Sequence, residues 1–220
     1  MLSCLTINSL DSMSQFIEMF GGKTINGTIA DLVENGIKSV KKIYKPNDTI
    51  EYIDISSIDA TNRTITETTL YEVAHAPSRA QQCVREGDIL VSTVRPINRN
   101  IAVVNKFSSN LVASTGFCVL RPKDGYRDYI LSVVLSDSFT EKMCDKANGG
   151  LYPAVNNVDV LSFGIHIPDK TLLRSVSSIY QHADKSEYEL RTTIDEIDAF
   201  IQWLTIKIYD NESRVTGFVA

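Results

Sequence analysis

The chain has 220 residues and a formal net charge of −5, with 43% hydrophobic and 22% charged residues. These totals fit one large domain, or a domain with an appendage, and exclude a chain that is disordered throughout. The negative total argues against a general nucleic-acid coat, but residues 35–45 and 79–106 are locally basic. Each basic segment can contact phosphate or form an ordinary solvated face, and the sequence leaves both interpretations open.

The four cysteines and three histidines are scattered along the chain and include no CxxC pair. Metal sites need ligands at close local spacing, so we expect no metal, no cofactor and reduced thiols in a cytoplasmic protein. The first twenty residues have no basic start and are interrupted by Asp11 and Glu18. They therefore predict neither a signal peptide nor a membrane span, and the sequence assigns no role to residues 1–45.

Between residues 49 and 168 the pattern is mainly that of strands, so we predict an α+β fold with a β-rich mixed domain over residues 1–168. Turns rich in Asn, Asp, Gly and Pro separate short runs of β-branched and aromatic residues. One helix is predicted over residues 126–147, ending at an Asn-Gly-Gly sequence. The predicted strand regions are residues 49–58, 87–94, 100–107, 116–122 and 161–168.

Residues 169–215 form a different region, in which apolar residues alternate in steps of three and four for about five heptads, with Glu187 as the exception. This pattern predicts a long coiled-coil helix, with Asp169 as its cap and residues 216–220 as a tail. Such a helix exposes an apolar stripe unless it pairs with another, so we expect a partner helix; the alternative is a helix folded back on its own domain. The residues expected to pair are Leu190, Ile194, Ile197, Ile201, Leu204 and Ile208.

Motifs for catalysis are missing from the sequence. It contains no G-x-S-x-G, H-E-x-x-H or G-x-G-x-x-G pattern, and none of the Asn/Asp-Pro-Pro-aromatic type used by amino-methyltransferases. We therefore predict a protein that binds and is not itself an enzyme.

Three stretches together resemble one family. They are APSRAQQCVREGDILVSTVRPINRNIAVV (residues 76–104), ASTGFCVLRP (113–122) and GGLYPAVNNVDVLSFGIHIP (149–168). With the long helix and YIDISSID (52–59), they resemble a target recognition domain and spacer helix of a type I restriction–modification specificity subunit. The resemblance covers about residues 50–210. Family members usually carry two recognition domains, each followed by a helix, whereas this chain has one of each, as in a half-length form.

The resemblance implies a sequence-specific DNA-binding subunit that reads one half-site of a bipartite target in double-stranded DNA. It also implies partners: the modification (methyltransferase) subunit docked on the helix, and a motor-nuclease restriction subunit in the restricting complex. Two paired helices would then hold two recognition domains at a set distance, in a homodimer or with a second specificity half.

The turn VSTVRPINRN (residues 91–100) has two arginines and two asparagines between buried strands, which suits DNA recognition. Arginine reads guanine and asparagine reads adenine, although most protein–DNA hydrogen bonds go to phosphate. Two alternatives remain open, namely that Arg95 pairs with an internal carboxylate such as Asp88 and that Tyr152 belongs to the core. The candidate DNA-binding residues are Arg79, Thr93, Arg95, Asn98, Arg99, Asn100, Ser114, Thr115, Tyr152 and Asn156.

The second interpretation of the whole chain is a non-catalytic homodimeric coiled-coil scaffold whose β-rich domain binds protein rather than DNA. The acidic total favours this scaffold slightly. Salt dependence separates the two, because phosphate contacts lose affinity steeply as salt rises.

Overall fold

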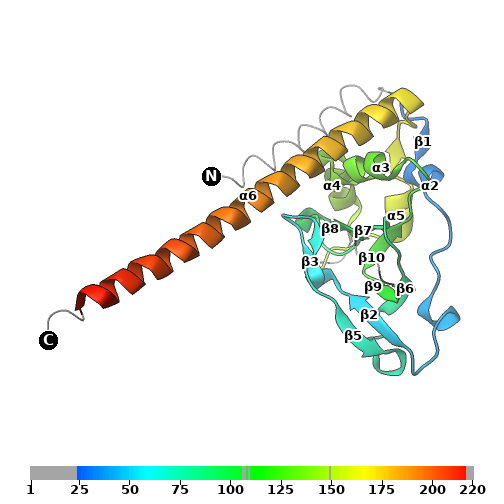
Figure 1. The fold of residues 1–220 in the computed structure, drawn as a ribbon. Coiled ribbons are helices and arrows are strands. Elements are labelled where there is room, and N and C mark those ends of the chain that lie inside the picture. Colours follow the sequence, from blue (N-terminus) through cyan, green and yellow to red (C-terminus); the bar gives the residue numbers. More distant parts are fainter. Residues whose placement is uncertain (1–23, 106–107, 109, 149, 217–220) are drawn as a thin grey trace. The chain divides into compact units, whose positions relative to one another are not determined.

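The computed structural model describes residues 24–105, 108, 110–148 and 150–216, and its helices and strands form the predicted α+β fold (Figure 1). The chain divides into two compact units, Met1–Val176 and Ser177–Ala220. The division lies inside the last helix, whereas the sequence predicts a boundary at its start. Within the described ranges, no helix is both long and apolar enough to cross a bilayer.

Two sheets form the centre of the first unit. One has the strand order β10-β7-β8 and the other β5-β2-β9-β6. Their neighbouring strands are antiparallel except β2 and β9, which run parallel with Ile53 beside Ala113. The strands are β2 (Thr49–Ile53), β5 (Thr69–Glu72), β6 (Ala80–Cys83), β7 (Ile89–Ser92), β8 (Ile101–Val103), β9 (Leu111–Ser114) and β10 (Phe117–Leu120).

Shorter elements surround these sheets. Two small two-stranded sheets pair β1 (Gly27–Thr28) with β11 (Gly164–Ile165), and β3 (Ile58–Asp59) with β4 (Thr64–Ile65). The short helices are α2 (Ile29–Leu32), α3 (Arg127–Leu135), α4 (Asp137–Lys146), α5 (Asn157–Leu161), η1 (Val40–Lys42), η2 (Ile55–Ser57), η3 (Val73–His75) and η4 (Pro96–Asn98).

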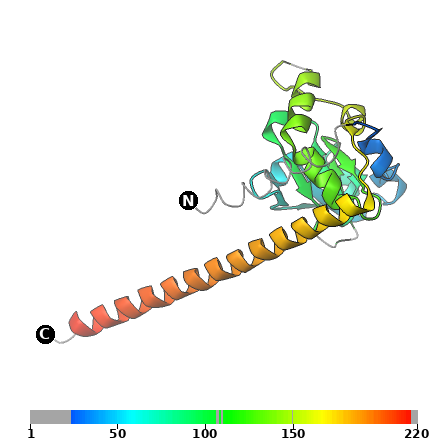
Figure 2. The same cartoon turned by 90° about the horizontal axis from the view of Figure 1, so that it is seen from above.

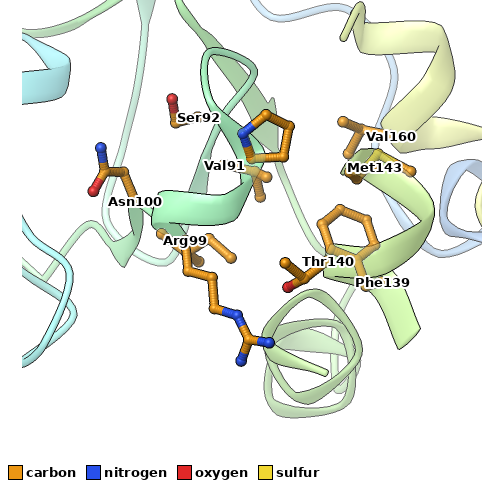
Figure 3. Close-up of a pocket in the computed structure, with 10 residues that line it drawn as sticks. Val91, Ser92, Arg99, Asn100, Phe139, Thr140, Met143 and Val160 are labelled. Carbon is orange, nitrogen blue, oxygen red and sulfur yellow. The ribbon is translucent and has the colours of Figure 1, made fainter. Parts of the chain in front are cut away.

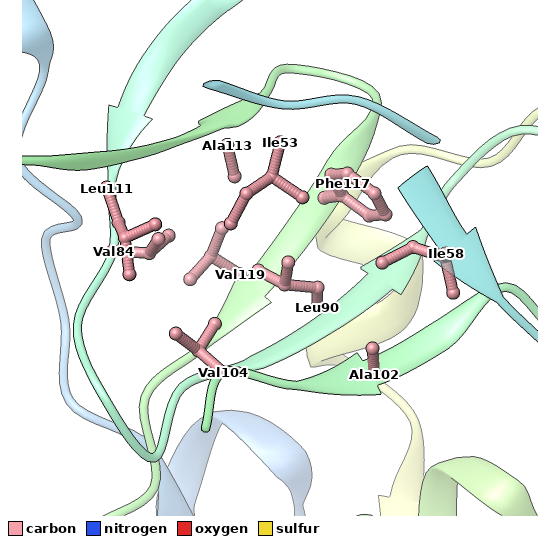
Figure 4. Packing of buried hydrophobic residues seen from close by; sticks show 10 residues of the cluster. All are labelled: Ile53, Ile58, Val84, Leu90, Ala102, Val104, Leu111, Ala113, Phe117 and Val119. Atoms are coloured by element: carbon pink, nitrogen blue, oxygen red, sulfur yellow. The ribbon is translucent and has the colours of Figure 1, made fainter. Parts of the chain in front are cut away.

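The main core joins the two central sheets (Figure 4). Side chains alternate between faces along a strand, so Leu111 and Ala113 of β9 enter this core while Val112 enters a second cluster on the other face. The second cluster also contains Val40, Ile50, Tyr52 and Ala80. Both faces of β9 are therefore buried, which fixes its register in the middle of the sheet.

The prediction of a single helix over residues 126–147 is wrong, because the structure has two helices there, α3 and α4. Ser136 separates them with an extended backbone (φ −68°, ψ 151°). Its hydroxyl accepts a hydrogen bond from the Phe139 backbone N–H at 3.1 Å, so Ser136 ends one helix and caps the next. The second helix ends at Lys146, ahead of the predicted Asn-Gly-Gly stop.

The long helix predicted at the C-terminal end is present as α6 (Lys170–Thr216), a single unbroken helix in Figures 1 and 2. Its 47 residues correspond to about 70 Å at the usual rise of 1.5 Å per residue. The predicted cap is confirmed, because the Asp169 carboxylate accepts a hydrogen bond from the Leu172 backbone N–H at 2.7 Å.

A buried ion pair between Asp88 and Arg121 stabilises the first unit. The Asp88 carboxylate, only 1% exposed, accepts hydrogen bonds from Arg121 Nε at 2.8 Å and Nη2 at 2.7 Å. These bonds raise the pKa of the Arg121 guanidinium. We expect Asp88→Ala to lower the free energy of unfolding by about 3–5 kcal/mol, because it leaves a charge without its partner in a mostly buried site.

The matched control for Asp88→Ala is Glu34→Ala, which removes the exposed ion pair with Arg85 and should cost about 1 kcal/mol or less. Urea denaturation followed by circular dichroism measures both changes. Equal losses in the two variants would contradict a structural role for the Asp88–Arg121 pair.

Candidate nucleic-acid interface

The turn between the buried strands β7 and β8 has a strained backbone. The short helix η4 is bounded by Arg95 (φ 50°) and Arg99 (φ 49°), both in the left-handed conformation. For a residue with a Cβ atom, that conformation costs roughly 1–2 kcal/mol relative to the right-handed one. Arginine therefore occupies two positions where glycine would have the lower backbone energy, and such strain is concentrated at functional sites.

Arg95 is exposed and stacks on Tyr152, with its Cζ atom 4.6 Å from the ring centroid. Its backbone N–H donates to the Pro153 carbonyl at 2.7 Å, so the turn is fastened to the loop that follows α4. The alternative pairing of Arg95 with Asp88 is wrong, because Asp88 binds Arg121. Tyr152 is not a core residue either, since it is 63% exposed.

Arg99 forms an ion pair with Asp137 at the start of α4, and in Figure 3 its side chain extends towards that helix. The Asp137 side chain is 77% exposed, so the pair lies at the surface. The negative charge of the Asp137 carboxylate would repel a phosphate that approached Arg99.

Replacing Asp137 with asparagine should strengthen binding to duplex DNA severalfold at low salt if Arg99 contacts phosphate. The substitution keeps the size of the side chain but removes the competing charge. It should cost only about 0.3–1 kcal/mol of stability through the loss of an acid in the first turn of α4. Fluorescence anisotropy at several salt concentrations measures the effect, and Ser138→Asn is the control; equal affinities for the two variants would remove Arg99 from the interface.

The three candidate asparagines, Asn98, Asn100 and Asn156, have different surroundings. Asn98 is exposed, whereas Asn100 is partly buried and lines a small pocket with Arg99, Phe139 and Met143 (Figure 3). The Asn156 side chain accepts a hydrogen bond from the Asp159 backbone N–H at 2.9 Å and caps α5. Asn156 is exposed, but its side chain already has the structural role of capping α5.

Two of the predicted residues face inward. Thr93 is 7% exposed and donates its hydroxyl to the Gly116 carbonyl at 2.9 Å, and Ser114 is fully buried with its hydroxyl 3.3 Å from the Gly116 N–H. In this conformation neither hydroxyl can reach a ligand. We therefore assign both side chains a structural role, in which they stabilise the turns, and we remove them from the candidate DNA-binding residues.

Arg79 and Thr115 are exposed, and backbone hydrogen bonds connect them to the Arg95 turn. The Thr115 N–H donates to the Arg79 carbonyl at 2.9 Å, and the Thr93 N–H donates to the Gly116 carbonyl at 2.9 Å. We call the surface formed by these residues the candidate interface. It consists of the exposed Arg79, Arg95, Asn98, Thr115 and Tyr152, together with the partly buried Arg99.

In the second unit, the predicted pairing residues form an exposed apolar seam on α6. Leu190, Ile194, Ile197 and Ile201 are 46–54% exposed and follow each other at steps of four, three and four. Leu204 and Ile208 continue the spacing within the same helix, but their side chains lie outside the described residues.

A second apolar feature of α6 was not expected from the heptad pattern. Phe200 and Trp203 stack with ring centroids 5.8 Å apart and are 58% and 52% exposed. At 3.6 residues per turn, this pair lies to one side of the apolar seam. The signal in the sequence was an aromatic pair at i, i+3 outside the seam positions, and its two rings form a second exposed apolar patch on the helix.

Comparison with known proteins identifies the class. No family model matches the chain. It is 28% identical over 146 residues to the specificity subunit of the type I restriction enzyme HindI from Haemophilus influenzae, across 64% of this chain and 32% of that protein. The crystal structure of the HsdS subunit from Thermoanaerobacter tengcongensis aligns with a TM-score of 0.61 and 29% identity, over 74% of this chain and 42% of that one.

A further structure, from work on complex assembly and conformational transition of the type I R-M system, aligns with a TM-score of 0.63 and 27% identity. That alignment covers 77% of this chain and 46% of the other. The chain is thus a homologue of type I restriction–modification specificity subunits, HsdS. It spans less than half the length of each of these relatives.

Proposed function

We propose that this chain is a non-catalytic, DNA-reading specificity subunit that recognises one half-site of a bipartite target. The observation that carries the proposal is the pair of left-handed arginines, Arg95 and Arg99, on a rigid turn in a homologue of HsdS. A guanidinium held in place by its backbone can bind guanine or phosphate with little loss of side-chain entropy.

The apolar seam of α6 would pair with the same seam on a second copy, or with the helix of a second specificity half. Four side chains that are about half exposed in a row support this, because such a stripe favours association. The Phe200–Trp203 pair lies outside the seam positions and is about half exposed. We assign it to docking of the modification subunit, which would supply methyl transfer; a restriction subunit would join the same complex.

The experiment that tests the proposal is selection of duplexes from a random pool by the full chain, together with any methyltransferase subunit that co-purifies from its native host. The expected result is two short words separated by a constant unread gap, because two linked recognition domains bind at a set distance. Failure to retain any duplex at low salt would overturn the proposal.

One observation favours the scaffold alternative, in which the first unit binds protein. Ile97, Leu151 and Val158 are 68%, 81% and 70% exposed, and Ile97 and Leu151 flank Arg95 in the turn and in the neighbouring loop. Exposed apolar side chains of this kind are common in protein interfaces. If affinity for duplex DNA is absent while a protein partner co-purifies independently of salt, the scaffold function is the correct one.

A further inference from the structure

The segment NGIKSVKKIYK (residues 35–45) forms a basic surface, which we call the lysine surface. Its four lysines, Lys38, Lys41, Lys42 and Lys45, are exposed, and the segment contains no acid although the chain carries a net charge of −5. Among the residues that the structure describes, none of the four forms an ion pair. Their charges are available for an external anion.

The acids that flank the segment in the sequence make no contact with its lysine ammonium groups in the part of the chain that the structure describes. Glu34 forms an ion pair with Arg85 at 3.0 Å, and the Asp48 carboxylate accepts a hydrogen bond from the Lys45 backbone N–H at 2.7 Å. Internal neutralisation of the lysine surface is therefore incomplete, and its positive potential extends into solvent.

The fold places the lysine surface next to β6 and its Arg79 end. Ser39 forms an antiparallel bridge with Gln82, and the Cys83 N–H donates to the Lys38 carbonyl at 2.9 Å. The chain then continues along β6 in the opposite direction, so that Val40 packs in one cluster with Ala80. Lys41 and Lys42 follow Val40 directly, towards the end of β6 where Arg79 precedes Ala80, the first residue of the strand.

We propose that Lys41 and Lys42, with Arg79, bind the phosphate backbone of duplex DNA and extend the candidate interface beyond the Arg95 turn. This inference rests on the proposed function. Lysine ammonium groups act as point charges for phosphate and carry little sequence information, so this surface supplies affinity and register but not base recognition. It connects to the turn through the bond from Thr115 N–H to the Arg79 carbonyl.

The test is the salt dependence of duplex binding by the full chain, with mixed-sequence DNA as the probe. The double variant Lys41→Gln/Lys42→Gln should reduce the slope of log Kobs against log salt by about 1.8, because each phosphate contact contributes about 0.9. Preference for the selected target over mixed-sequence DNA should stay within about twofold of wild type.

The control is Lys123→Gln/Lys170→Gln, which removes the same charge from two other exposed positions and should leave the slope nearly unchanged. If wild type binds DNA and the two double variants have equal slopes, the role of the lysine surface is overturned while the proposed function stands. Loss of a co-purifying protein in Lys41→Gln/Lys42→Gln, with an unchanged slope, identifies an acidic protein surface instead and also overturns it. If wild type retains no DNA, the proposed function fails first.

Discussion

Replacing Leu190 and Ile197 with aspartate should convert a dimer, or a helix-paired complex, into monomers. Burying a leucine or isoleucine contributes about 1.5–3 kcal/mol, and a symmetric pair of helices buries four such side chains at these two positions. Because these side chains are already about half buried in the single helix, the double variant should weaken association at least about 10²-fold, before the cost of burying the new charges. Sedimentation velocity over a range of concentrations measures the change.

Thr192→Asp/Ala199→Asp is the matched control for the apolar seam. It places the same two charges on exposed positions that lie away from the seam by helical spacing, so it should still associate. A wild-type chain that sediments as a monomer with its full helix content would contradict the pairing.

The second large effect concerns DNA binding by Arg95. Arg95→Gly should weaken binding of the assembled complex to its target about 5- to 150-fold, which corresponds to 1–3 kcal/mol for one well-placed guanidinium contact. The free energy of unfolding should stay the same or rise by about 1 kcal/mol. Glycine removes the cost of the left-handed backbone, and this offsets the lost contact with Tyr152.

Arg63→Gly is the control for Arg95→Gly, because Arg63 is also a left-handed arginine (φ 56°) but lies in the turn between β3 and β4. It should change DNA affinity little. Anisotropy titrations and urea denaturation of both variants separate binding from folding; equal losses of affinity would show that Arg95 makes no contact of its own.

The sequence predicted the elements whose pattern is local. Each of the five predicted strand regions contains a strand, and the heptad spacing predicted α6. Three strands of the larger central sheet, β5, β6 and β9, lie outside those regions and were missed. The sequence of β6, AQQC, has no β-branched residue. Gln82 holds that strand in place by donating to the Ser114 and Phe117 carbonyls, more than thirty positions away. Contacts of that range leave no periodic signal.

The candidate interface shows the same division. The sequence located the turn and its arginines, but their neighbours come from distant segments, Tyr152 for Arg95 and Asp137 for Arg99. The inward positions of Thr93 and Ser114 depend on how two turns meet at Gly116. Only the three-dimensional fold could distinguish these supporting hydroxyls from the exposed one of Thr115.

The position of β9 between β2 and β6 has a consequence for how the protein is made. While a ribosome is still extending the chain, β2 and β5 can form a hairpin, but the other edge of β2 has no partner until Leu111–Ser114 emerges. β6 also has no partner strand until β9 has been synthesised. A nascent chain that ends before Ser114 exposes an unpaired strand edge. At this stage of synthesis the chain is prone to aggregation and can be bound by a chaperone.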